Sequence, residues 1–331
     1  MAPIQLPVNR PGESIFAGGA RISELRSAPR SSDCQGEDWI ASTTCCFGTD
    51  AIGYSRLPDG TLLREAVTSE PDKWLGPQHN AKYGPDTKLL VKLLDASQRL
   101  PVHAHPHVDW ARKHLRRSHG KAEAWYILTS GSVWLGLTED VDERELLELV
   151  QSERGAELLP KMHRFDVQPH QTLYVPPGTL HAIGEGVMVV EVQEPEDLSI
   201  LCEWVGHNVD GKKDGHLGLG FPVALTGVNN RGWTREQVER CWVKNESDHA
   251  QSVFANDSRE YFRMERLAVK GQVTTQRGFA VLIVLEGKMS LRTEKSESIS
   301  IGKGSTVVIP YEDGDMHLDG EGEVLIARPP L

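Results

Sequence analysis

The sequence predicts a mainly β protein that folds into two small barrels with a few inserted helices. Short β-type runs punctuated by Gly and Pro recur along the chain, which is typical of a sheet protein. Two long segments also repeat one order of predicted strands and turns. The runs that we expect to be strands are residues 86–95, 123–137, 165–176, 187–193, 279–285 and 304–310.

The repeated order lies in residues 163–183 and 297–318. HRFDVQPHQTLYVPPGTLHAI and ESISIGKGSTVVIPYEDGDMHL each read as a strand, a turn, a second strand ending in Pro, a loop and a lone histidine. Before each lies a predicted hairpin of apolar strand, Gly and apolar strand, at residues 125–137 and 280–292. Hairpins at this spacing close sheets without leaving edges, so a duplicated small barrel is the simplest interpretation.

Helical patterns are few and are expected as insertions between strands. They fall at residues 107–117, 140–154 and 234–241. A polar stretch at 245–258 has few residues able to build a core. We therefore predict a metal-binding domain with inserted helices at 1–250 and a C-terminal barrel at 251–331.

Composition excludes several classes of partner. The chain has 331 residues, 39% of them hydrophobic, and a net charge of -11, so it can build a core but has no global field that attracts nucleic acid or anionic lipid. An anionic substrate would need a local basic pocket. The five cysteines form no CxxC pair, and neither a signal peptide nor an apolar run near 18 residues is present. A cytoplasmic protein is the expectation.

The candidate metal site starts from two histidines two residues apart in a strand-like run. Residues i and i+2 of a strand point to the same face, so His103 and His105 can aim both imidazoles at one point inside a barrel. Glu123 begins a later strand, and His181 follows a Pro-Pro-Gly turn that can direct it inward. Three nitrogens and one oxygen suit zinc, iron, manganese or nickel.

A single histidine is more often a solvated or satisfied residue than a ligand, and we apply that interpretation to the others. We expect surface positions for five further histidines: His107, His114, His119, His163 and His170. After residue 250 only His317 remains, without a second histidine two residues away or a carboxylate partner, so no second metal site is expected.

Several motifs resemble the class I mannose-6-phosphate isomerases, which are zinc-dependent proteins with two double-stranded β-helix (cupin) barrels. The motifs are LLVKLLDASQRLPVHAHP (89–106), GKAEAWYIL (120–128) and YVPPGTLHAIGEGVMVVEVQ (174–193). GEDWIASTT (36–44) is similar to the family's early tryptophan-containing strand. The resemblance spans most of the chain and implies the same fold and the isomerisation of a sugar phosphate. It also implies a Zn²⁺ cofactor, with other divalent transition metals possible.

The resemblance also implies roles for individual residues. His105, Glu123 and His181 take the places of the family's zinc ligands, and His103 falls where the family usually has a glutamine ligand. Lys121 is implied as a cation that contacts substrate. Two further residues follow from matching positions: Glu191 as an acidic residue lining the barrel, and Trp39 as a substrate contact.

Two departures bear on phosphate binding. Pro101 stands where the family has a serine that helps to hold phosphate. Where the family carries an arginine, the stretch LCEWVGHNVDGKK offers His207, with Lys212 and Lys213 beyond it. We expect His207 and Lys212 to contact substrate, although histidine is only near half-charged at neutral pH and lacks the fork of an arginine.

Interconversion of an aldose and a ketose needs a base that moves a proton between adjacent carbons, while a metal stabilises the charge on oxygen. Candidate catalytic residues are Glu191, His207 and Lys121, and Glu191 is favoured because its apolar neighbours can raise its pKa toward neutrality. Mannose 6-phosphate and fructose 6-phosphate are the first expected pair. The alternatives are an isomerase of a non-phosphorylated or other sugar, an iron-dependent oxygenase of the same fold and a catalytically weak sugar-binding protein. The expected partner is a small sugar or sugar phosphate, with a homodimer possible through the C-terminal barrel.

Overall fold

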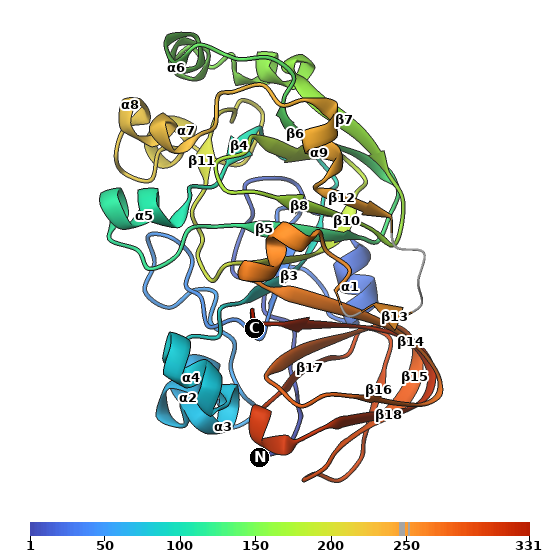
Figure 1. Cartoon of the computed structure of the whole chain (residues 1–331). Coiled ribbons are helices and arrows are strands. Elements are labelled where there is room, and N and C mark those ends of the chain that lie inside the picture. The colour runs from blue at the N-terminus through green and yellow to red at the C-terminus, as the bar shows by residue number, and fades with distance from the viewer. Residues whose placement is uncertain (245–248, 251) are drawn as a thin grey trace.

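The structure is a computed structural model that describes residues 1–244, 249–250 and 252–331. Its described strands form three antiparallel sheets, and the C-terminal sheet is the largest (Figure 1). That sheet has the order β1-β17-β15-β18-β14-β13, with β16 paired to β15. Its strands are β1 (Ile4–Gln5), β13 (His249–Ala250), β14 (Arg263–Thr275), β15 (Ala280–Thr293), β16 (Ile299–Gly302), β17 (Thr306–Ile309) and β18 (Met316–Arg328).

The other two sheets carry the candidate site. The six-stranded sheet has the order β12-β8-β5-β10-β3-β2, and the five-stranded sheet has the order β11-β4-β9-β6-β7. Their strands are β2 (Glu37–Ile40), β3 (Leu90–Asp95), β4 (His103–Ala104), β5 (Glu123–Ile127), β6 (Gly131–Leu137), β7 (Met162–Val167), β8 (Gln171–Val175), β9 (His181–Ile183), β10 (Met188–Gln193), β11 (Ile200–Leu201) and β12 (Trp242–Lys244). One buried core contains side chains from both sheets, including Trp125 of β5 and Leu135 of β6, so the sheets pack face to face.

Strand pairing confirms the duplication. In the N-terminal half, β5 pairs with β8 and β10, while β6 pairs with β7 and β9. In the C-terminal half, the single strand β15 pairs with β17 through its first residues, with β16 through its later residues and with β18 along most of its length. Strands β5 and β6 together thus match β15, and strands β9 and β10 together match β18. Strand β7 matches β16, and strand β8 matches β17.

The two predicted hairpins at 125–137 and 280–292 were wrong. In the first, β5 and β6 lie in different sheets and do not pair with each other, because the chain at 128–130 passes from one sheet to the other. In the second, Gly287 lies inside the continuous strand β15, just after a register shift between Val284 and Glu286. Gly287 has a φ of 85°, a conformation that glycine adopts without the strain of a side chain, so the strand can continue past the irregularity.

The helices are α1 (Arg21–Arg26), α2 (Leu63–Ser69), α3 (Pro71–Leu75), α4 (Pro77–Tyr83), α5 (Val108–Leu115), α6 (Glu143–Gln151), α7 (Gly211–Asp214), α8 (Phe221–Ala224) and α9 (Arg235–Glu239), with 3₁₀ turns at η1 (Gly155–Lys161), η2 (Leu225–Gly227), η3 (Asn256–Glu260) and η4 (Tyr311–Asp313). Helices α2 to α8 lie to one side of the sheets, on the left in Figure 1. The three predicted helices are confirmed as α5, α6 and α9. Asp142 caps α6 by accepting from the backbone N–H groups of Arg144 and Glu145, and one face of α6 is buried. No described helix is long and apolar enough to cross a bilayer.

The C-terminal sheet is buried on both faces where it meets the rest of the molecule. Along β15, Leu282 and Val284 belong to the interior of the C-terminal barrel, whereas Val281 and Ile283 belong to the core shared with the N-terminal sheets. Successive side chains of a strand point to opposite faces, which accounts for the unbroken apolar run AVLIVL. The predicted boundary at 250 stays a prediction, because residue 251 lies outside the described residues.

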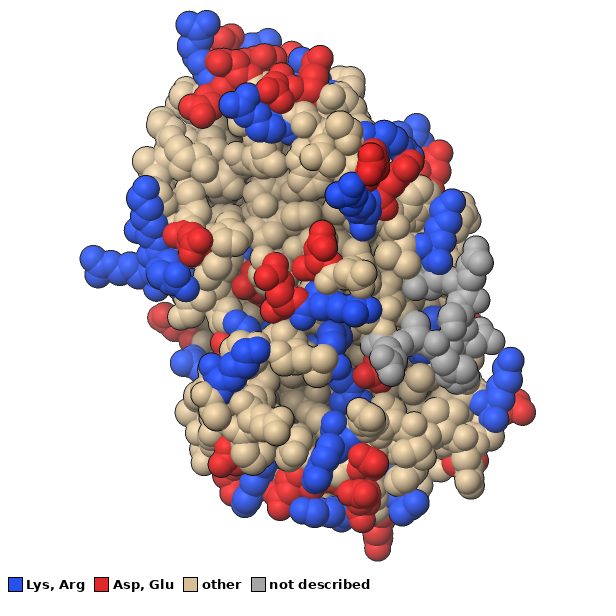
Figure 2. Space-filling model, viewed as in Figure 1, with Lys and Arg blue, Asp and Glu red and all other residues tan. Residues whose placement is uncertain are grey.

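Charges of both signs are interspersed on the face of the molecule drawn in Figure 2. This mixed pattern agrees with the net charge of -11, and a column of Lys and Arg side chains runs from the centre of that face toward its lower end. The face is hollowed between the region of α2–α4 and the C-terminal sheet. The candidate site lies elsewhere, within the N-terminal half.

Candidate metal and active site

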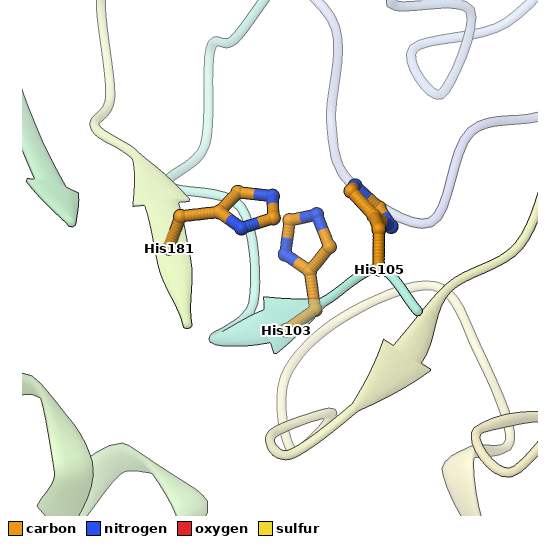
Figure 3. Close-up of side chains that lie close together, drawn as sticks. All are labelled: His103, His105 and His181. Carbon is orange, nitrogen blue, oxygen red and sulfur yellow. The ribbon is translucent and has the colours of Figure 1, made fainter. Parts of the chain in front are cut away.

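Three histidines converge inside the N-terminal half (Figure 3). His103 of β4 is the direct strand partner of His181 of β9, and His105 follows β4 by one residue. One ring nitrogen from each of the three lies within 4.8 Å of the others, and all three side chains are buried. The structure therefore brings together the three predicted nitrogen ligands.

Backbone carbonyls fix how these imidazoles present their nitrogens. Each Nδ1 lies within hydrogen-bond distance of a carbonyl oxygen: His103 of Pro101 (2.8 Å), His105 of Leu198 (2.7 Å) and His181 of Thr179 (2.9 Å). A carbonyl only accepts, so each Nδ1 carries the proton and each Nε2 keeps its lone pair. Burial lowers the pKa of all three side chains, to about 3 for His105. Three neutral imidazoles with unprotonated Nε2 atoms are the form that binds a divalent cation.

Glu123 supplies a carboxylate at the same point. Its Oε2 lies 3.0 Å from His105 Nε2 and its Oε1 lies 3.3 Å from His181 Nε2. Burial raises the pKa of Glu123, but the neighbouring His105 and Lys121 outweigh burial and hold this pKa well below its usual range. Glu123 Oε2 and His181 Nε2 are buried and form no hydrogen bond within the described chain. Lone pairs that face one another repel unless a cation lies among them, so the donor set fits a divalent metal.

Two lysines and a second carboxylate lie beside the ligands. Lys121 Nζ is 2.9 Å from His105 Nε2 and 3.6 Å from Glu123 Oε2. On the adjacent strands β10 and β3, Glu191 is the direct partner of Lys92, and their charged atoms are 3.3 Å apart. Burial and the charge of Glu123 raise the pKa of Glu191 to about 7, while Lys92 opposes them. Glu191 is therefore poised to exchange a proton near neutral pH.

These groups line one cavity of about 380 Å³. Trp39, predicted as a substrate contact, lines it as well, and the ammonium group of Lys92 lies 4.8 Å from the centroid of the Trp39 ring. Apolar side chains such as Leu100 and Leu201 form part of the wall. The cavity size suits a small, polar molecule of the dimensions of a sugar.

Comparison with known proteins agrees with this geometry. The family model for the mannose-6-phosphate isomerase cupin domain matches residues 252–329. Along nearly the full length, the chain is 26% identical over 321 residues to a Bacillus subtilis protein named probable mannose-6-phosphate isomerase GmuF, with 94% of this chain and 95% of the relative covered. The chain is thus similar to mannose-6-phosphate isomerases along most of its length.

Two further comparisons point in the same direction. Mannose-6-phosphate isomerase ManA of B. subtilis is 28% identical over 250 residues, which is 72% of this chain and 74% of the relative. The crystal structure of the mannose 6-phosphate isomerase from B. subtilis has the same fold, with a TM-score of 0.70 at 21% identity, over 99% of this chain and all of that one.

Two residues that the sequence suggested as substrate contacts do not reach the cavity. His207 Nε2 lies 2.9 Å from the carbonyl oxygen of Arg99, and His207 is not among the lining residues. Lys212 is exposed on α7 and forms an ion pair with Glu153 outside the cavity. Their assignment as substrate contacts stays a prediction that the shape of the cavity does not support.

Lys92 is the site residue that sequence reasoning missed. It is buried, and although burial lowers its pKa, Glu37 and Glu191 outweigh burial and raise it. Its signal was available as a single lysine in the apolar run LLVKLLD, because a lysine in the middle of a buried strand needs a partner.

The expected surface position of His119 was wrong. His119 is buried, and its Nε2 lies 2.6 Å from Asp86 Oδ2. Burial lowers the pKa of His119, but its hydrogen bond with Asp86 and the nearby carboxylate of Glu194, 3.8 Å from Nδ1, raise it to about 9 overall. Of the other four histidines, His107 is exposed and His114, His163 and His170 are half-buried.

Proposed function

We propose that this chain is a metal-dependent aldose–ketose isomerase that interconverts mannose 6-phosphate and fructose 6-phosphate. The observation that most strongly supports this proposal is the convergence of three neutral imidazoles and a carboxylate beside the Lys92–Glu191 pair in one cavity. The names of relatives that cover most of the chain support the same reaction.

His103, His105, Glu123 and His181 would hold the metal, and zinc is the ion that we propose. Three nitrogens and one oxygen are a donor set that zinc accepts in catalytic sites. A bound divalent cation would stabilise negative charge on the sugar oxygens during the reaction. The carbonyl oxygens that fix each Nδ1–H hold the rings in the orientation that such binding requires.

Glu191 is proposed as the base that moves the proton. In the open-chain aldose it takes the proton from C2, the C–H electron pair becomes the C1=C2 bond, and the C1=O1 π pair moves to O1. Return of that proton to C1, with transfer of the O2 hydroxyl proton to O1, gives the ketose and requires no co-reactant. The pKa of Glu191, raised to about 7, allows both uptake and return of the proton. Lys121 would anchor a sugar oxygen or relay the second proton.

Two coarser expectations accompany this proposal. The five cysteines are all free, which supports a reducing compartment such as the cytoplasm. Association through the C-terminal barrel into a homodimer stays a proposal to be tested by sedimentation.

The direct test is an isomerase assay on purified protein loaded with zinc. We expect fructose 6-phosphate to form from mannose 6-phosphate, activity to disappear when a chelator removes the metal, and zinc to restore it. Failure of zinc-loaded protein to isomerise any phosphorylated or free sugar, or full activity without metal, would refute the proposal. Turnover that consumed oxygen would instead identify an oxygenase.

A further inference from the structure

The charge of the cavity lining is strongly acidic. Six carboxylates line it: Glu13, Glu37, Glu123, Glu191, Asp197 and Asp214. The lysines that line it are Lys92 and Lys121, and no described lining residue is an arginine. A phosphate dianion in a protein site is normally held by two or more cationic donors, of which the arginine fork is the strongest.

Both lysines are already engaged by the protein. Lys92 pairs with Glu191, and Glu37 and Asp197 also favour its charged form. Lys121 lies beside His105 and Glu123, and in the proposed reaction it anchors a sugar oxygen or relays a proton. The lining therefore has no pair of lysines left to hold a phosphate dianion.

The outer part of the cavity repels anions. Glu13 and Asp214 are exposed, so they lie where the lining meets solvent. The stretch LCEWVGHNVDGKK (201–213), in which a phosphate-binding cation was expected, instead contributes Leu201 and Val209 to the lining. Both are apolar side chains.

An acidic lining does suit an uncharged sugar. An ionised carboxylate has only acceptor sites, and every sugar hydroxyl carries one donor hydrogen. Free acceptor capacity is present, because Glu191 Oε1, which is not a proposed metal ligand, accepts no hydrogen bond within the described chain. The apolar wall around Leu100 and Leu201 can pack against the C–H faces of a sugar ring.

We infer that the cavity also accepts unphosphorylated aldoses and ketoses, such as mannose and fructose, and that a phosphate group adds little to their recognition. This inference rests on the proposed isomerase activity and specifies its substrate class. The chemistry is the same proton transfer between C1 and C2, which does not involve the position that carries the phosphate.

The test compares kcat/KM of the zinc-loaded enzyme for mannose 6-phosphate and for mannose. We expect the ratio, phosphorylated over free, to stay below about 10, because no pair of lysines is left to hold the phosphate. A ratio above about 10 overturns the inference while leaving the isomerase proposal intact. Absence of turnover with both sugars refutes the isomerase proposal itself, so the two failures are distinguishable.

A charge-reversal pair tests the cause. Asp214→Lys places a cation at the acidic lining and should raise the ratio at least about fivefold, since charge at a cleft steers anionic ligands. Glu143→Lys makes the same change of charge on the exposed side of α6, outside the cavity, and should leave the ratio within about twofold. An unchanged ratio in Asp214→Lys, or an equal rise in both variants, would overturn the inference.

Discussion

Replacement of Glu191 by Gln tests the chemical step most directly. The side chain is 3% exposed and lies on β10 between Lys92 of β3 and Trp125 of β5, so an amide of the same shape fits without repacking. The change removes the group that takes the proton but none of the four proposed metal ligands. A positioned general base contributes about 10²- to 10⁴-fold to rate, which corresponds to about 3–5 kcal/mol of transition-state stabilisation.

We therefore expect Glu191→Gln to lose 10²- to 10⁴-fold in kcat, again from the contribution of a general base, with KM changed far less. Exchange of the C2 proton of the sugar in D₂O should fall in parallel, because the same group performs that transfer. The assay is initial-rate isomerisation with metal content measured on the same samples. Glu185→Gln, an exposed carboxylate in the turn before β10, is the matched control and should retain wild-type rates.

Removal of a buried carboxylate also leaves Lys92 with one partner fewer, which can destabilise the fold. Glu37 and Asp197 remain near Lys92, so we expect the variant to stay folded and to bind metal. A kcat within about tenfold of wild type at equal metal content would refute Glu191 as the base, since that is below the usual effect of a general base.

Three further outcomes follow from the geometry. His103→Ala should lower bound zinc below one ion per chain and abolish turnover, measured by elemental analysis alongside the isomerase assay; full zinc content would contradict its role as a ligand. The pKa of His119, raised from about 6.5 to about 9, should contribute about 3 kcal/mol of stability that is complete below pH 6.5 and lost as pH rises through 9. Urea titrations of wild type and His119→Gln at pH 6 and pH 9.5 measure it, and a stability gap that does not shrink at high pH would count against it. Gly155→Ala should destabilise the protein by roughly 3 kcal/mol or more, because the added methyl group would overlap the carbonyl oxygen of Cys202. Gly302→Ala is the control, because the added methyl group has room there. Equal melting temperatures of the two variants would refute this prediction.

Patterns local in sequence predicted the parts of the fold that depend on local spacing. The β-type runs at 165–176 and 187–193 and the two-residue spacing of His103 and His105 each depend on a few neighbouring residues, and both are confirmed. Helices α1 to α4 were missed because they have five to seven residues, too few to show a helical period.

Features that depend on distant partners could not be predicted. His119 is buried by its bond to Asp86, 33 residues earlier in the chain, and nothing near His119 reveals that contact. Leu201 lines the cavity, whereas His207 and Lys212 do not. This difference depends on the path of the chain after β11. The pairing of β5 and β6 with different sheets is likewise set by tertiary closure, because a short Gly-containing link between apolar runs can equally form a hairpin.

The pairing of β1 with β17 has a consequence for synthesis of the chain. Gln5 and Ser305 are hydrogen-bonded although 300 residues separate them. At translation rates of about 5–20 residues per second, the first strand waits roughly 15–60 s for its neighbour to leave the ribosome. Until then the backbone N–H and C=O groups around Ile4 lack their strand partner, and chaperones or other chains can bind this edge. We expect nascent chains halted before residue 300 to be sensitive to proteolysis near their start, and release of the last barrel to end that sensitivity.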